Sequence, residues 1–361
     1  MSPKSIEQIR ANCTKELKGQ GAILPKEYFS QLANYTDENV TADVYGKGGA
    51  LEEFEAELAD LLGQEQCVFL PSGIMAQLVA MRIWSDQAQN SLIAFHPTSH
   101  LELHEEKAYQ HLHNLQAIKV GEADQVMTLS DLQKMPSLPS ALIMELPLRE
   151  IGGQLPQWSE LLEQVEYLRS KGVKVHLDGA RLWECRDFYN KSYAEIAGLF
   201  DSVYVSFYKG IGAPSGAALL GSGEFIKQAR VWIRRHGGNV FTSFPNYLAA
   251  RKGVEEKLQR FPLYHQRAKE VAQLISSIEG VKVIPENPQI NMFHIHFSGD
   301  AKVLAGRALE FAEREKIWSF AELQPTDSEG VCRFEWYVGE KALEVSDGEV
   351  ERLFRYVVGD N

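Results

Sequence analysis

The sequence has few cysteines and fewer basic than acidic residues, and both shortages limit what the protein can be. Its four cysteines are far apart and form no CxxC pair, which fits reduced thiols in a cytoplasm better than a disulfide framework. The 37 basic residues are outnumbered by 49 acidic ones, which gives a formal net charge of -12. Binding to nucleic acid or to an anionic membrane surface is therefore not expected.

Long apolar runs are also missing. No window approaches the ~18 uninterrupted apolar residues of a membrane-spanning helix, and the N-terminus lacks an apolar core of signal-peptide length, so we expect neither membrane insertion nor export. No GxGxxG motif follows a strand and opens a helix, which argues against a nicotinamide enzyme. With 361 residues and 44% hydrophobic content, the chain can form a large and a smaller globular domain.

The first two thirds of the chain alternate between strand-like and helix-like segments. A stretch at 50–63 has its leucines on one helical face. Strand signals recur, mostly with helical intervals between them, at 66–70, 91–95, 141–146, 174–178, 202–207 and 216–221. Strands separated by helices predict an α/β domain with a mainly parallel sheet and helices on both faces.

From about residue 256 the pattern becomes that of an α+β domain. We expect strands at 281–285, 291–297 and 331–337, and amphipathic helices at 301–316 and 349–358. Ser346 and Glu349 form a capping-box pattern before the last helix. The predicted domains are an N-terminal arm (1–35), a large domain (36–255) and a small C-terminal domain (256–361).

An acid and a lysine stand at the ends of two predicted strands. Asp178 ends a buried strand, where an unpaired carboxylate is costly, so it needs a partner or a protonated ligand. Lys209 follows the next strand and precedes glycines that let a ligand approach the backbone. Pyridoxal phosphate requires this pair, a lysine for its Schiff base and an acid that keeps its pyridine ring protonated.

An anion site is indicated at 69–81, where a strand runs through Pro-Ser-Gly into a helix. The amides of Gly73, Ile74 and Met75 can face an anion at the helix N-terminus, and the Ser72 hydroxyl can join them. Each feature alone also has an ordinary structural explanation, as a turn residue, a solvated lysine or a helix cap. Their occurrence together, in this order, favours a cofactor phosphate at this place.

The motifs HLDGARLWE and SVYVSFYKGIGAPSGAALLGS closely resemble those of the threonine aldolase and β-eliminating lyase family. DVYG, LPSGIMAQLVA and SHLELHE resemble further segments of this family in the expected order, over residues 40–255. The family consists of pyridoxal phosphate enzymes of the aspartate aminotransferase fold (fold type I). The resemblance therefore implies a mainly parallel seven-stranded sheet, and a homodimer or homotetramer with active sites at the subunit interface.

The resemblance assigns roles by position. It implies that Lys209 forms the Schiff base, that Asp178 contacts the pyridine nitrogen and that Arg181 contacts the phenolic oxygen of pyridoxal 5'-phosphate. His100 would stack on the ring, so His100, Asp178 and Lys209 are the expected catalytic residues. Arg333 is the expected receptor for the substrate α-carboxylate, because a bidentate arginine fixes its orientation; a surface charge on an alternating strand is the competing explanation.

Four further residues are expected at the site, three of them from the resemblance. Arg234 and Arg235, in the segment RRHGGN, would help to hold the phosphate in a neighbouring subunit, although a solvated helix end is an alternative. Tyr45, in DVYG, would complete the same site. Arg149 could orient the substrate's hydroxyl or a carboxylate, but as a cation it cannot accept a proton.

Three positions depart from the family pattern. Ile74 replaces a threonine, which leaves a backbone amide but no hydroxyl, and Tyr208 replaces a serine before the lysine. Leu148 occupies the position of a second active-site histidine, so another group must accept the β-hydroxyl proton. The remaining candidates are His100, Glu150 and a water held by the cofactor phosphate.

The expected reaction is cleavage of the Cα–Cβ bond of a β-hydroxy-α-amino acid, which gives glycine and an aldehyde. We expect a preference for β-hydroxy amino acids bulkier than threonine. The alternative is a β-eliminating lyase that expels a β-substituent from its amino acid substrate. A non-catalytic protein on this fold is a second alternative, but the intact Asp178 and Lys209 speak against it.

The histidines allow one further interpretation. His96, His100 and His104 recur every four residues, so a helix could present two of them with Glu105 to a metal. Pro97 interrupts the first interval, however, and no HExxH motif is present. We therefore expect no metal site. The histidines of 111–113 and 294–296 alternate as strand residues do, and a structural role is expected for both pairs.

Overall fold

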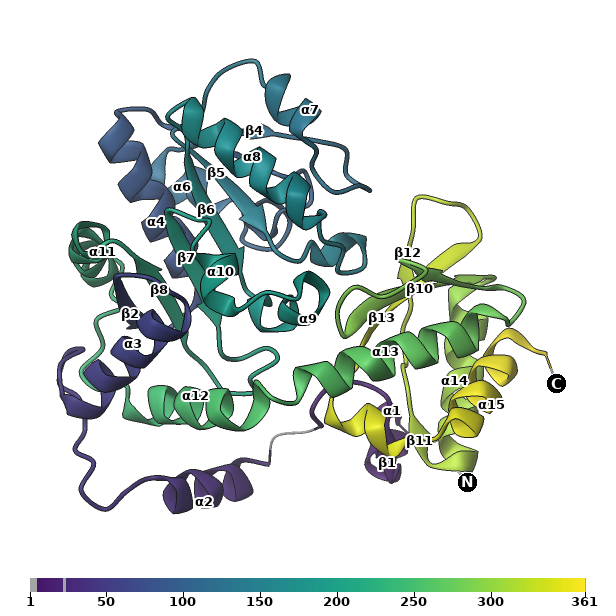
Figure 1. Cartoon of the computed structure of the whole chain (residues 1–361). Helices are drawn as coiled ribbons and strands as arrows, with labels where there is room; N and C mark the ends of the chain where they lie inside the picture. The colour runs from purple at the N-terminus through teal and green to yellow at the C-terminus, as the bar shows by residue number, and fades with distance from the viewer. Residues whose placement is uncertain (1–4, 22–23, 361) are drawn as a thin grey trace. The chain divides into compact units, whose positions relative to one another are not determined.

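The computed structural model describes residues 5–21 and 24–360, which form two compact units (Figure 1). The first, the sheet unit, contains residues 24–150 and 155–259. The second, the C-terminal unit, contains residues 5–21, 151–154 and 260–360. The N-terminal segment 5–21 thus belongs to the same unit as the end of the chain.

A seven-stranded sheet forms the centre of the sheet unit, with the strand order β2-β8-β7-β6-β5-β3-β4. The strands are β2 (Gln66–Leu70), β3 (Leu92–Phe95), β4 (Gln116–Lys119), β5 (Ala141–Glu145), β6 (Lys174–Gly179), β7 (Ser202–Ser206) and β8 (Ala217–Gly221). β8 is antiparallel to β2 and β7, whereas the other neighbouring strands are parallel. The predicted mainly parallel sheet of seven strands is confirmed.

Helices cover both faces of this sheet. α4 (Gly73–Ala88) packs on β5 to β8, and α8 (Trp158–Ser170) packs on β6. The other helices of the unit are α2 (Pro25–Tyr35), α3 (Gly49–Leu61), α5 (His100–Leu103), α6 (Ala108–His113), α7 (Leu129–Gln133), α9 (Arg186–Tyr189), α10 (Tyr193–Ala197), α11 (Gly223–Arg235) and α12 (Phe244–Lys257). Both faces of the central strands are therefore buried, as is typical of parallel sheets.

A buried polar network fixes α4 to the sheet. His176 on β6 donates from Nε2 to Oε1 of Gln77 on α4 (2.8 Å), and its Nδ1 lies 2.7 Å from the Ser202 hydroxyl on β7. Ser202 in turn accepts from Nε1 of Trp84 (2.8 Å). Burial lowers the pKa of His176 to about 3, so the ring stays neutral and serves as a structural link.

The C-terminal unit contains a four-stranded antiparallel sheet with the order β12-β13-β10-β9. Its strands are β9 (Val281–Ile284), β10 (Met292–Ser298), β12 (Gln324–Pro325) and β13 (Val331–Tyr337), and β1 (Lys15–Glu16) pairs with β11 (Ile317–Trp318). Its helices are α1 (Ile6–Ala11), α13 (Phe261–Ser276), α14 (Ala301–Glu315) and α15 (Asp347–Val358). The capping box of Ser346 and Glu349 is present at the start of α15.

Two local predictions differ from the structure. The histidines of 111–113 lie in helix α6 instead of a strand, because three alternating residues are too few to distinguish a period of 2 from one of 3.6. Strand β4 was not predicted, since its sequence QAIK is short and half polar. The strand around His294 and His296 is β10, as predicted. Among the described helices, none is long and apolar enough to cross a membrane.

Candidate active site

Three polar side chains form a row across the sheet unit, at the carboxyl ends of neighbouring strands. Glu145 of β5 is paired in register with Asp178 of β6, and Asp178 is paired with Tyr204 of β7. Residues paired in this way point to the same face of the sheet. That face is covered by α4, since His176, two residues before Asp178, bonds to Gln77 of this helix. The row therefore lies beneath the N-terminal end of α4.

Two carboxyl groups of this row are buried next to each other. Asp178 is 2% exposed and its Oδ1 accepts a hydrogen bond from the amide of Ala180 (3.1 Å). Glu145 accepts from the amide of Arg149 through Oε1 (3.2 Å), while its buried Oε2 has no hydrogen-bond partner among the described residues. Burial, reinforced by the charge of Asp178, raises the pKa of Glu145 to about 7. Near neutral pH the pair can therefore share a single negative charge.

Lys209 follows β7 and lies close to this carboxyl pair. Burial is the main cause that lowers the pKa of its amine, and the charge of Arg181 adds to this effect. The charges of Asp178 and Glu145 act in the opposite direction, which places all these groups within electrostatic range of the amine. A lysine with a lowered pKa has more of its nucleophilic neutral form at neutral pH.

His100, the first residue of α5, is joined to the same group of charges through Glu105. Its Nδ1 lies 2.9 Å from Oε1 of Glu105, which is 5% exposed. Burial raises the pKa of Glu105, whereas the hydrogen bond from His100 lowers it, and the charges of Asp178 and Lys209 also act on it. His100, Asp178, Arg181 and Lys209 thus belong to one group of interacting side chains, and their functional roles stay predictions.

A second histidine pair lies beside the first. The ring centroids of His100 and His104 are 5.1 Å apart, with the planes tilted by 47°. Nε2 of His104 lies 3.0 Å from Oε1 of Glu150, and Nη1 of Arg149 donates to the same oxygen (3.0 Å). The segment after β5 therefore contributes both Arg149, which acts electrostatically on Lys209, and a carboxylate that holds His104.

The N-terminus of α4 meets the polar row at Gly73. Ser72 caps this helix, and its hydroxyl accepts a hydrogen bond from the amide of Met75 (3.4 Å). A Cβ atom at position 73 would lie 1.9 Å from the Tyr204 hydroxyl and 2.8 Å from that of Tyr208, so glycine is required there. The two phenol oxygens are 3.1 Å apart. Two hydroxyl groups and the first amides of a 16-residue helix thus converge at one point.

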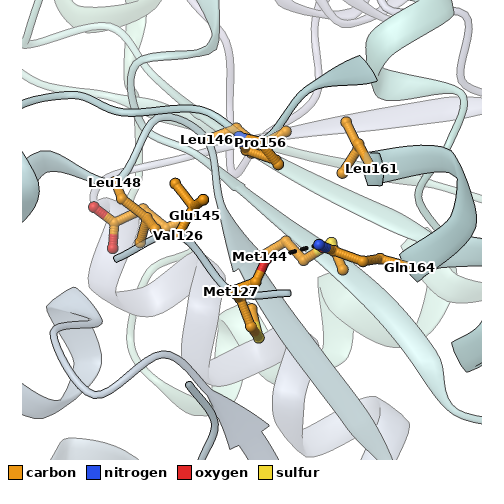
Figure 2. Close-up of a pocket in the computed structure, with 9 residues that line it drawn as sticks. All are labelled: Val126, Met127, Met144, Glu145, Leu146, Leu148, Pro156, Leu161 and Gln164. Atoms are coloured by element: carbon orange, nitrogen blue, oxygen red, sulfur yellow. Dashed lines mark hydrogen bonds between the residues drawn. The ribbon is translucent and has the colours of Figure 1, made fainter. Parts of the chain in front are cut away.

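Leu148 and Ile74 differ in their surroundings. Ile74 is 39% exposed in the first turn of α4, so its side chain does not close this helix end. Leu148 is buried in a small, mainly apolar pocket, shown in Figure 2, where Gln164 donates a hydrogen bond to the Met127 carbonyl (2.7 Å). The lining residues of this pocket are Val126, Met127, Met144, Glu145, Leu146, Leu148, Pro156, Leu161 and Gln164. Position 148 therefore has a packing role.

The remaining predicted site residues have local contacts of their own. Tyr45 has a positive φ of 50° and packs edge-on against Phe241, with the ring centroids 5.4 Å apart. Arg234 and Arg235 end helix α11, and the guanidinium carbon of Arg235 lies 4.3 Å from the centroid of the Trp232 ring. Arg333 lies on β13 of the C-terminal unit and donates from Nε to Gln324 (3.0 Å). Their functional roles stay predictions.

Sequence reasoning missed the functional context of three acidic residues. Glu145 ends strand β5 as Asp178 ends β6, and this shared position at a buried strand end was the available signal. Glu105 was considered only as a metal ligand, and Glu150 only as a proton acceptor. Their histidine partners could not be inferred from sequence, because the His104–Glu150 contact joins residues 46 positions apart.

Comparisons with known proteins agree on one family. Residues 32–298 match the family model described as beta-eliminating lyase. A candidate L-allo-threonine aldolase from Listeria monocytogenes is 38% identical, with a TM-score of 0.94 over 98% of this chain and 99% of that chain. A candidate aromatic amino acid beta-eliminating lyase/threonine aldolase from Exiguobacterium is also 38% identical, with a TM-score of 0.92 over 98% and 100%. The low-specificity L-threonine aldolase 1 of Arabidopsis thaliana is 25% identical over 77% of this chain and 80% of its own length.

Proposed function

Because the chain belongs to the beta-eliminating lyase family, as its motifs predict, we propose that it is a pyridoxal 5'-phosphate-dependent carbon-carbon lyase. Its substrates are β-hydroxy-α-amino acids, which it cleaves to glycine and an aldehyde. The observation that carries this proposal is the pairing of a lysine of lowered pKa with a buried carboxylate at the ends of adjacent strands, Lys209 and Asp178. The names of the similar proteins, among them a threonine aldolase, support the same reaction.

The residues at the strand ends fit this cofactor. Lys209 would hold its aldehyde carbon covalently, and Asp178 would keep a proton on the pyridine nitrogen. When bound, pyridoxal phosphate supplies a conjugated pyridinium ring that withdraws the electron pair left on Cα by bond cleavage. Arg181 would contact the phenolic oxygen and His100 the ring face, and both lie within the same group of charges.

The start of α4 fits a phosphate. Gly73 has no side chain to block its approach, and the tyrosine hydroxyls lie where a Cβ at this position would be. We propose that the Tyr208 hydroxyl supplies the donor that Ile74 lacks, together with the amides of Gly73 and Ile74. The Ser72 hydroxyl already accepts from Met75 and still has its own proton to donate.

The substrate is a small amino acid molecule, and two arginines are proposed to bind it. Arg333 would pair with the α-carboxylate in a bidentate manner. Arg149, fixed by Glu150 and close enough to act on Lys209, would orient the substrate's hydroxyl. We retain the proposal that β-hydroxy amino acids bulkier than threonine are preferred, which the assay below ranks directly.

We further propose a homodimer or homotetramer in which Tyr45, Arg234 and Arg235 complete the partner's site. Exposed apolar side chains around Tyr45 support this, since Tyr45 is 52% and the adjoining Phe241 63% exposed. A fully active monomer in light scattering would contradict the proposal. A cytoplasmic location is proposed from the four cysteines, which are all free thiols.

The test is a product assay of the purified holoenzyme. Threonine, allo-threonine and phenylserine are assayed for glycine and aldehyde, alongside serine, cysteine, tyrosine and tryptophan for pyruvate. We expect glycine and aldehyde, and a yellow absorbance band that borohydride abolishes. Pyruvate without glycine would replace the proposal by a β-eliminating lyase, and a colourless protein that gains no band with added cofactor would overturn the cofactor assignment.

A further inference from the structure

We propose that His104, held by Glu150, is the general base that removes the β-hydroxyl proton of the substrate. The inference rests on the proposed carbon-carbon cleavage, which requires such a base. Leu148, at the position expected to carry a second histidine, is buried in an apolar pocket. A different histidine, from the segment after α5, is available beside His100.

The hydrogen bond to Glu150 determines the state of the His104 ring. A carboxylate can only accept, so the hydrogen of the neutral ring is assigned to Nε2, which lies 3.0 Å from Oε1 of Glu150. Nδ1 is then the basic nitrogen, and within the described residues it makes no hydrogen bond. An acid that orients a histidine and stabilises its protonated form is the arrangement that general bases use in hydrolases.

Arg149 makes Glu150 suited to orient His104 and less suited to act as the base itself. Its Nη1 donates to the oxygen that also contacts His104 (3.0 Å), and this adjacent positive charge favours the ionised carboxylate. An acid stabilised as an anion is a weaker proton acceptor, but it attracts the imidazolium that forms when His104 takes a proton. The Glu150 side chain is also the more enclosed, at 13% exposed against 40% for His104.

His100 is the alternative base, and its contacts assign it to a different task. Its Nδ1 is hydrogen-bonded to Glu105, and the charges of Asp178 and Lys209 act on the pKa of Glu105. His100 is therefore part of the group of charges around the cofactor position. His104 is hydrogen-bonded instead to Glu150, which Arg149 also contacts, and its side chain is 40% exposed. The two neighbouring rings thus divide cofactor contact and proton acceptance between them.

The proton step balances within the proposed reaction. As the Cα–Cβ bond breaks, the electron pair of the O–H bond forms the second bond of the aldehyde carbonyl, and the proton moves to Nδ1 of His104. The pair of the Cα–Cβ bond stays on Cα, where a returning proton completes glycine. His104 then releases its proton to water and is again a base.

The experiment separates bond cleavage from the other steps of the holoenzyme. His104→Asn is compared with His111→Asn, which changes an exposed histidine on α6, outside the site. We expect His104→Asn to lower kcat for the best β-hydroxy substrate by about 10²–10³-fold, the usual contribution of a general base. The dissociation constant for glycine, measured by its absorbance change, and deuterium exchange of the glycine α-proton should stay within about threefold of wild type, because neither involves a β-hydroxyl group.

The outcomes distinguish this inference from the proposed function. If wild type forms no glycine from any β-hydroxy amino acid, the proposed function fails. If wild type does form glycine and His104→Asn cleaves as fast as His111→Asn, only the inference fails. The inference is also overturned if His104→Asn loses glycine binding as well, since the residue would then hold the cofactor or the shape of the site. His100→Asn should impair both cleavage and glycine binding.

A second readout does not depend on activity. The Nε2–H proton of the His104 ring, identified by its loss in His104→Asn, is observed by NMR in the apoenzyme. Glu150→Ala removes the acceptor of this hydrogen. The resonance should then move upfield or broaden through faster exchange with water, whereas Glu160→Ala on α8 should leave it unchanged. An unchanged resonance in Glu150→Ala would overturn the pairing.

Discussion

The central strands of the sheet unit and strand β13 of the C-terminal unit differ in how far their polar residues are exposed to solvent. Every residue of β7 is buried, as are five of the six residues of β6, so Asp178 has no face that reaches solvent. In β13, buried residues alternate with half-buried ones, and Arg333 occupies a half-buried position. A charged residue in a buried parallel strand therefore requires a specific partner, whereas one in an antiparallel strand can face solvent.

Two buried acids of the sheet unit differ in the same sense from an acid at a helix start in the C-terminal unit. In the sheet unit, burial raises the pKa values of Glu145 and Glu105. In the C-terminal unit, hydrogen bonds from Lys15 and from the amide of Ser346 hold the pKa of Glu349 at about 2. Burial thus favours the protonated form of a carboxyl group, whereas the hydrogen bonds at the helix start favour the anion. Four substitutions test this contrast.

The largest effect is expected for Lys209→Ala. Without the amine there is no covalent link to the cofactor aldehyde, so turnover should fall by ~10³-fold or more while the protein stays folded. Lys227→Ala, an exposed lysine of α11, is the control and should behave as wild type. The measurement is turnover together with the mass of the borohydride-reduced protein. A reduced cofactor adduct that persists in Lys209→Ala would remove this residue from its role.

Asp178→Asn should follow, with turnover lowered by about 10²–10³-fold. Asparagine can still accept from the Ala180 amide but has no charge to keep a proton on the pyridine nitrogen. Cofactor affinity, measured by fluorescence titration of the apoenzyme, should fall much less than turnover. Near-normal turnover with cofactor bound would contradict the role of Asp178 and would weaken the rule that buried strand-end acids mark the site.

Arg333→Ala tests whether the C-terminal unit contributes to catalysis. If Arg333 binds the α-carboxylate, its loss should raise KM by about 10–100-fold with a smaller change in kcat, because a charge-assisted hydrogen bond contributes roughly 1.5–3 kcal/mol. The matched control is Lys282→Ala on β9. His296 of β10 is paired with Arg333 on one neighbouring strand and with Lys282 on the other. Equal KM values for the two variants would assign Arg333 to the solvent face alone.

The smallest effect is expected for Glu145→Gln, and it appears in stability. The folded apoenzyme keeps the proton of Glu145 up to about pH 7, whereas the unfolded chain releases it near the ordinary pKa of a glutamate, 4.5. The free energy of unfolding of wild type should therefore fall as the pH rises through this window, and Glu145→Gln should not share this loss. The free energy of unfolding of the variant minus that of wild type should therefore rise by about 1–3 kcal/mol between pH 5 and pH 8. A difference between the two proteins that is independent of pH would contradict the raised pKa.

Much of the fold could be predicted because its signals are local. The buried strands at 66–70 and 174–178 consist of apolar runs bounded by turns, and the structure places β2 and β6 there. The short edge strand β4 gave no such signal. The histidines of 111–113 were assigned to a strand, but a three-residue segment cannot distinguish the period of a strand from that of a helix.

The site was predictable only where family motifs carry it. Asp178 and Lys209 were identified because each ends a strand within a recognisable motif. Glu145 was missed because its importance comes from register with Asp178 on the next strand, and register is a property of the folded sheet. The partnership of His104 with Glu150 depends on how the segments after α5 and β5 come together, which no pattern within either segment records.

The contact at Gly73 bears on how descendants of this chain would change if catalysis were lost. A side chain there would collide with the hydroxyls of Tyr204 and Tyr208 whether or not a cofactor is bound, so the fold itself would select against replacement. Lys209 has no such packing restraint, and its burial costs free energy. A non-catalytic paralogue is therefore expected to keep the glycine and to lose the lysine first. In genome comparisons, position 209 would reveal the loss of activity, whereas position 73 would report only that the scaffold still folds.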